Sequence, residues 1–279
     1  MNTLKSRLIV FCVLAVCSTP AVVFADTYTI TDYSTGPDGS NSYWGGGVTL
    51  FPTGEPIPNI SDTLGGNNYD VDTLTVTRDS NSFSAVLTGQ YFQSNEKEFI
   101  GDLFLSSAWT PTSSGSNDTH YADNVAGSTT WEYVLRIMND DPVTPGTSDT
   151  GTIGLYKIDS TTGQIVLSNE TLVDQQGVYR ADQEVQYTTT DPALKTGTWT
   201  LDAVTGTFTF SLSLAGLDDD ELAFLEGSLG LHWTMSCGND VIEGQIPAMG
   251  ASSVPEPATM LLFGAGLSGL AAYRRRARK

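Results

Sequence analysis

The chain has 279 residues, a formal net charge of −19 at pH 7 and only three cysteines. This acidic balance excludes nucleic acid from the expected partners, because a protein that binds phosphate backbones needs clustered Lys and Arg. It favours solubility and the attraction of divalent cations. Two cysteines lie in the N-terminal apolar segment, so Cys237 is alone in the rest of the chain and an intramolecular disulfide is excluded there.

Residues 1–25 predict a secretory signal peptide. Lys5 and Arg7 precede an apolar core, and small residues then suit signal peptidase, which would cleave between Ala25 and Asp26. The alternative is a lipoprotein acylated at Cys17, but the preceding residue is valine where Gly, Ala or Ser is usual. We therefore expect cleavage and release of the mature chain from this end.

An ectodomain is expected over residues 26–245, followed by a linker at 246–253. Seven of the 13 basic residues but only one of the 32 acidic residues lie in the two terminal segments. The part between them therefore carries 31 acidic and six basic residues, a net charge of −25. Its length is sufficient for one large β domain.

The ectodomain begins with a predicted strand at residues 28–31 and a loop rich in Gly around Tyr43 and Trp44. Gly-rich runs beside aromatic residues allow the backbone to approach another strand or a ligand closely. Two interpretations of Tyr43 and Trp44 stay open. They pack in the core, or they form a carbohydrate contact.

A β-hairpin with a threonine-rich outer face is predicted next. Leu74, Val76 and Arg78 alternate with threonines, Asp79-Ser80-Asn81 forms a turn, and the alternation resumes from Phe83. A buried strand is expected at residues 103–105. Another is expected at residues 131–138, with one face formed by Trp131, Tyr133, Leu135 and Ile137.

Two further hairpins are predicted from turns that begin with Asp and end with Gly of positive φ. The first joins residues 153–158 to 164–168 through Gly163, and the second joins 198–201 to 207–214 through Gly206. A single short helix follows at residues 219–226, where Asp218 and Glu221 form a capping box and Gly227 ends the helix.

Cysteine and histidine are the natural candidates for a nucleophile and its base. Residues 229–237 predict a strand with its odd positions in the core, which places His232 and Cys237 on opposite faces and makes Cys237 a buried thiol. His120 lies near Asp118 and Asp123, yet no His or Cys spacing there supports a transition metal. We expect a polar loop at this position.

The many acidic residues give weaker guidance. Asp70, Asp72, Asp102 and Asp240 are candidate calcium ligands in loops, although solvated turns are the preferred explanation of them. A carboxylate pair for glycoside hydrolysis carries no information, because a chain this acidic provides such pairs in any fold. The sequence contains no nucleophile elbow, zinc-protease, Walker or dinucleotide-binding motif. We therefore expect that the protein is not an enzyme, that it has no catalytic residue, and that calcium is its only candidate cofactor.

The alternation of apolar residues, the Gly and Asp turns and the scarcity of helix predict an all-β ectodomain. The expected architecture is a single antiparallel β-sandwich of jelly-roll type with one short helix.

The C-terminal segment, residues 254–279, has three parts. Val254-Pro255-Glu256-Pro257 is a rigid extended segment, since each proline fixes φ and restrains the residue before it. Residues 258–273 are apolar and predict a short transmembrane helix. A basic tail closes the chain and would hold that end in the cytoplasm as a membrane stop, formed by Arg274, Arg275, Arg276, Arg278 and Lys279.

These C-terminal residues resemble the PEP-CTERM sorting signal of exported bacterial proteins. The resemblance covers about a tenth of the chain and implies recognition of the Pro-Glu-Pro motif by an exosortase. It further implies an intermediate in the inner membrane, followed by delivery to the cell surface or to an extracellular polysaccharide matrix as in biofilms.

Three functions for the ectodomain follow in order of preference. The first is a non-enzymatic structural or adhesive protein of the surface or matrix. The second is a carbohydrate-binding module, with or without calcium, that acts on exopolysaccharide. The third, with the least support, is a secreted polysaccharide hydrolase or lyase.

Overall fold

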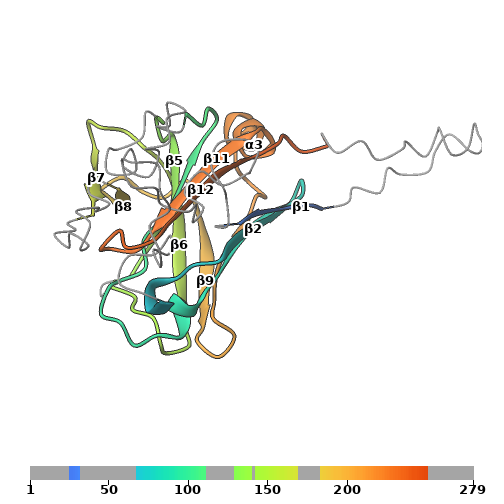
Figure 1. Cartoon of the computed structure of the whole chain (residues 1–279). Coiled ribbons are helices and arrows are strands. Elements are labelled where there is room, and N and C mark those ends of the chain that lie inside the picture. The colour runs from blue at the N-terminus through green and yellow to red at the C-terminus, as the bar shows by residue number, and fades with distance from the viewer. Residues whose placement is uncertain (1–24, 32–66, 111–128, 140–141, 169–182, 251–279) are drawn as a thin grey trace, which may run out of the picture.

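The computed structural model describes residues 25–31, 67–110, 129–139, 142–168 and 183–250 (Figure 1). Several predicted features lie outside these residues: the signal peptide up to residue 24, Tyr43 and Trp44, His120, and the whole C-terminal segment 254–279. Among the residues described, no helix is long and apolar enough to span a membrane.

Ten antiparallel strands form one continuous sheet in the order β1-β2-β3-β10-β9-β6-β5-β4-β11-β12. A separate two-stranded ribbon consists of β7 (Gly163–Leu167) and β8 (Glu184–Thr189). The strands of the main sheet are β1 (Asp26–Thr31), β2 (Thr73–Arg78), β3 (Ser82–Thr88), β4 (Leu103–Ser106), β5 (Tyr133–Ile137), β6 (Asp149–Lys157), β9 (Lys195–Asp202), β10 (Thr207–Ser213), β11 (Leu229–Thr234) and β12 (Val241–Ile246).

The sheet curls until its two end strands meet. β1 contacts β12, and the backbone N–H of Gly250 donates a hydrogen bond of 2.7 Å to the Asp26 carboxylate. The result is a nearly closed, barrel-like sandwich whose two layers are halves of one sheet (Figure 1). The predicted all-β, antiparallel class is confirmed.

Arg78 also closes the sandwich and is fully buried. Its guanidinium donates to the carbonyls of Leu225 at 2.6 Å and Gly227 at 2.8 Å, and also to the carbonyl of Pro247. The first two carbonyls lie at the C-terminal end of helix α3 (Asp219–Glu226), where the helix dipole favours a cation. Arg78 therefore ties β2 to the opposite edge of the sheet.

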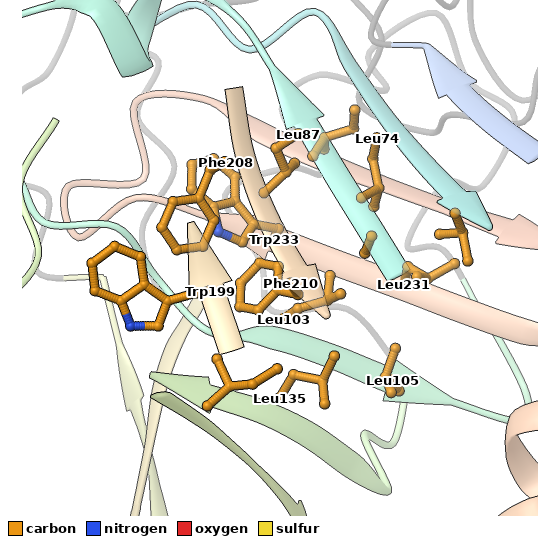
Figure 2. Close-up of a cluster of buried hydrophobic side chains, with 14 of the residues drawn as sticks. Leu74, Leu87, Leu103, Leu105, Leu135, Trp199, Phe208, Phe210, Leu231 and Trp233 are labelled. Carbon is orange, nitrogen blue, oxygen red and sulfur yellow. The ribbon is translucent and has the colours of Figure 1, made fainter. Parts of the chain in front are cut away.

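The main core fills the space between the two layers. Apolar residues from the inner faces of all ten strands of the main sheet form one cluster, and Figure 2 shows Trp199, Phe208, Phe210 and Trp233 together with leucines from β2, β3, β4, β5 and β11. The rings of Trp199 and Phe208 stack with their centroids 5.4 Å apart. Two short 3-10 helices, η1 (Asn67–Tyr69) and η2 (Gln90–Gln93), contribute Tyr69, Tyr91 and Phe92 to this cluster.

The hairpins β2–β3 and β9–β10 are confirmed. In the second hairpin, Gly206 has a φ of 69°, as its turn requires. Helix α3 also begins as predicted, because Asp218 accepts hydrogen bonds from the N–H groups of Asp220 and Glu221 while the Glu221 side chain accepts from the Asp218 N–H.

The predicted hairpin of residues 153–158 with 164–168 is wrong. β7 pairs with β8, while β6 is flanked by β5 and β9. The turn itself forms, with the Gly163 N–H bonded to the Asp159 carbonyl at 2.9 Å, but Gly163 does not have a positive φ. Its lack of a side chain makes room instead for the ring of Tyr187.

Trp131 also differs from its prediction. Regular strand geometry begins at Tyr133, so the period of two does not extend back to Trp131. Tyr133, Leu135 and Ile137 face the main core, whereas Trp131 packs with Phe104 in a second cluster on the outer side of the sheet.

Candidate functional site

The outer side of β4, β11 and β12 carries a buried group of ionisable and aromatic side chains outside the main core. Phe104, His232 and Glu243 are neighbours in the strand register, His232 lying opposite Phe104 on one side and Glu243 on the other. The β7–β8 ribbon covers this region and brings Glu184 to it. We call His232, Glu243 and Glu184 the histidine cluster.

His232 is fully buried and both of its ring nitrogens face acceptors. Nδ1 lies 2.9 Å from Glu243 Oε2, and Nε2 lies 3.0 Å from the backbone carbonyl of Glu184 and 3.8 Å from its Oε2. A neutral imidazole can donate from one nitrogen only. This geometry therefore suits the imidazolium form, whose positive charge is balanced by carboxylate.

The electrostatics agree with this assignment. Burial acts to lower the pKa of His232, but the hydrogen bond to Glu243 and the charges of the two glutamates outweigh it and raise that pKa. Burial raises the pKa of Glu184, while the nearby His232 acts to lower it. Removing one partner of such a buried, hydrogen-bonded pair destabilises a fold strongly, because the other charge is left buried without compensation.

Two tryptophans close the histidine cluster. The Trp131 ring centroid lies 5.4 Å from that of His232, and the Trp131 side chain acts to lower the pKa of Glu184. The half-buried Trp109 donates from Nε1 to Glu243 Oε1. The glutamate side chains are only 11% and 6% exposed. In this closed arrangement, the cluster joins the ribbon to the sheet and leaves no room for a substrate at the imidazole.

Asp102 forms a second joint between the ribbon and the sheet. Its carboxylate accepts from the backbone N–H of Ile137 at 2.8 Å and of Tyr187 at 2.9 Å, while its own N–H donates to the Val185 carbonyl at 2.8 Å. Burial raises the pKa of Asp102 to about 7, although these two hydrogen bonds and Arg136 act in the opposite direction.

The structure brings Asp240 close to the segment of Asp70 and Asp72, but the candidate calcium ligands do not form a metal-binding group within the described residues. Asp102 is committed to the ribbon, and Asp240 accepts from the N–H groups of Val71 at 2.7 Å and Val241 at 3.0 Å. Asp70 and Asp72 are the residues directly before and after Val71. Within the described ranges, no three His, Cys, Asp or Glu residues are grouped so that they could hold a metal ion.

Cys237 is a buried thiol in the main core, as predicted. It lies in the turn between β11 and β12, where Gly238 has a φ of 69°. The hydroxyl of Ser236 donates to Glu98 at 2.7 Å and accepts from the Phe99 N–H at 3.1 Å, so this buried turn fixes the segment before β4. Cys237 and His232 lie on opposite sides of the sheet, so the structure does not bring this thiol and this imidazole together as a nucleophile and its base.

The outer side of the other half of the sheet carries a feature that was not predicted as a whole from the sequence. The outward positions of six adjacent strands, β1, β2, β3, β10, β9 and β6, are almost all Thr or Ser. Sequence alternation showed this for one hairpin alone, because the strand order is needed to place the six strands next to one another. We call this surface the hydroxyl face.

Comparison with known protein families identifies the C-terminal segment. Residues 253–276 match the PEP-CTERM protein-sorting motif. The chain carries a PEP-CTERM sorting motif. It is therefore an exported protein targeted to an exosortase, with a membrane-anchored sorting intermediate. The match covers the tail and says nothing about the ectodomain, for which comparisons with curated proteins and with solved structures found no match.

Proposed function

We propose that this chain is a non-enzymatic protein of the cell surface or extracellular matrix, released from its membrane intermediate by an exosortase. The PEP-CTERM motif at residues 253–276 carries the proposal. The C-terminal motif directs the sorting of such an exported chain, and the ectodomain then acts at the location to which it is sorted.

The ectodomain supports a structural or adhesive role. Its most reactive side chains are used to hold the fold: His232 is enclosed by two glutamates and two tryptophans, and Cys237 lies in the core on the opposite side of the sheet. A general base must reach the proton that it abstracts. In the described structure, burial keeps His232 from that task.

The sorting step can be tested in host cells by following the size and membrane fraction of the chain. Glu256→Ala, or deletion of residues 252–279, should abolish conversion to the shorter surface form. With Glu256→Ala, the unprocessed chain should accumulate in the inner membrane. A matched control, Glu226→Ala, changes an exposed glutamate of α3 and should be processed normally. Normal processing of the Glu256→Ala chain would refute the assignment.

A further inference from the structure

We propose that the hydroxyl face is a docking surface for an uncharged polysaccharide. The inference rests on the proposed function and names the partner of the delivered ectodomain. It depends on four features of the face: its register, its rigidity, its lack of charge and its size.

The strand register aligns the hydroxyl groups into rows that cross the sheet. One row consists only of hydroxyl residues and a second is interrupted only by Val86. A third, shorter row ends at Asp202. The first row is Thr27, Thr77, Ser84, Ser211, Thr198 and Thr152, the second Thr29, Thr75, Val86, Thr209, Thr200 and Thr150, and the third Thr31, Thr73, Thr88, Thr207 and Asp202.

Neighbouring hydroxyls hold one another in place. The side-chain oxygens of Thr27 and Thr77 are 3.1 Å apart, and those of Thr29 and Thr75 are 3.0 Å apart. A hydroxyl has one donor and two acceptor sites, so each bonded pair still offers a donor and lone pairs to a partner. Threonine is also stiff at χ1, which lowers the entropy lost on binding.

The face lacks charge although the ectodomain is strongly acidic. Of the three rows, only the end of the third carries an ionisable side chain, that of Asp202. The net charge of the domain would repel a polyanion and a second copy of this chain, while a cationic partner would be drawn to the acidic loops. The partner that this face suits is neutral and rich in hydroxyl groups.

The dimensions fit a polymer. Six strands spaced at about 4.8 Å span roughly 24 Å, and alternate residues along a strand repeat at about 6.7 Å. A polysaccharide chain crossing the strands can therefore contact several positions of a row at once. Each contact is weak because it replaces hydrogen bonds to water. Many simultaneous contacts supply the affinity, so a polymer should bind far better than a free sugar.

The test is a depletion assay with the full chain purified in detergent. The probes are microcrystalline cellulose, curdlan and cross-linked dextran, three neutral glucans, with carboxymethyl cellulose as an anionic polymer on the cellulose backbone. We expect retention on at least one neutral glucan, weaker binding to the anionic polymer, and no competition from free glucose at equal sugar concentration.

The deciding variant is Thr198→Glu with Thr200→Glu, two exposed positions in the first two rows. It should weaken retention at least tenfold. The matched control is Thr188→Glu with Thr190→Glu, which makes the same charge change at exposed positions at the end of the ribbon and should stay within twofold. Thr198→Val with Thr200→Val, which removes the hydroxyls without adding charge, should also weaken retention.

Circular dichroism of each variant separates lost binding from lost folding. Equal retention of the Thr198 and Thr200 variants and of the control would overturn the proposal, as would a wild-type chain that none of the three neutral glucans retains. Either result leaves the sorting assignment intact, because Glu256→Ala tests that assignment independently in cells.

Discussion

The two outer sides of this curled sheet differ in what their side chains do. One side, over β4, β11 and β12, is covered by a ribbon and holds a buried histidine, two glutamates and two tryptophans. The other side, formed by the adjacent strands β1, β2, β3, β10, β9 and β6, is lined by hydroxyls and is not covered by any of the described elements. The reactive chemistry is enclosed, and the accessible surface is chemically plain.

This difference shows why residue types alone mislead in such a chain. The covered side has the composition expected of an active site, yet the hydrogen bonds of His232 and Asp102 join the ribbon to the sheet. The three rows of the hydroxyl face contain neither histidine nor cysteine, yet their regularity is suited to a repeating partner.

The largest effect should come from His232→Gln. Removing the cation leaves Glu184 and Glu243 buried without their charge partner, which typically costs about 3–5 kcal/mol. Urea denaturation should show this loss as a lower midpoint. Thr198→Ala on the hydroxyl face is the control and should stay within about 0.5 kcal/mol of the parent. Equal stability of the His232→Gln chain and its parent would contradict the role of the histidine cluster.

The pH dependence of stability should also originate on the covered side. Asp102 has a pKa of about 7, above its ordinary value of 3.8, so the folded state binds a proton that the unfolded state has released. The free energy of unfolding should therefore fall as pH rises from about 4 to 7, by at most about 4 kcal/mol. His232, whose pKa is also raised, adds a loss of the same sign above its unfolded pKa of 6.5.

Asp102→Asn isolates this contribution. The amide cannot ionise, and its NH₂ group faces one of the two backbone donors, so the variant should be less stable than the parent at pH 5. The difference should shrink by pH 8, where the parent carries a buried charge. Urea titrations at both pH values measure this convergence. A difference that stays the same at both pH values would show that Asp102 is ionised throughout this range.

A smaller effect is expected from Trp109→Phe. The ring is largely preserved, but the hydrogen bond from the indole N–H to Glu243 is lost, at a cost of about 1–3 kcal/mol. The same substitution should cost less in a Glu243→Gln background, because the acceptor is no longer charged. Denaturation of the four chains of this double-mutant cycle provides the measurement, and simple additivity would argue against the contact.

The smallest change in stability should follow substitution on the hydroxyl face. Thr200 is exposed, and its replacement by glutamate breaks no contact of the core. The free energy of unfolding of Thr200→Glu should therefore stay within about 0.5 kcal/mol of the parent value. Its effect on glucan retention should nevertheless be the largest of any single substitution discussed. Thermal denaturation alongside the depletion assay checks both statements, and a strongly destabilised variant would show that the face also supports the fold.

Local patterns predicted much of the fold. The hairpins at residues 73–88 and 195–213 and the capped helix depend on residues close in sequence, where alternation and turn chemistry decide the structure. The partner of β7 could not be predicted this way. Its pairing with β8, beyond residues 169–182, and the position of β6 between β5 and β9 are set by contacts distant in sequence.

The histidine cluster was missed for a similar reason. His232 was considered only with Cys237, and β12 was not recognised because Glu243, Gly244 and Gln245 interrupt its apolar pattern. The pairing of His232 with Glu243 could have been predicted from the turn between β11 and β12. A hairpin centred on Cys237 and Gly238 places His232 opposite Glu243, as the structure has it. Glu184 comes from a separate ribbon, and local sequence carries no indication of its approach.

The contrast between the two sides is tested most directly by measuring, on the same two variants, the unfolding free energy and the retention on a neutral glucan that binds the parent chain. Thr198→Glu with Thr200→Glu should lose retention and keep its stability, whereas His232→Gln should lose stability and keep retention at a temperature where it remains folded. The reverse outcome, with retention lost through His232→Gln and unchanged in the hydroxyl-face variant, would place the binding surface on the covered side and contradict this account.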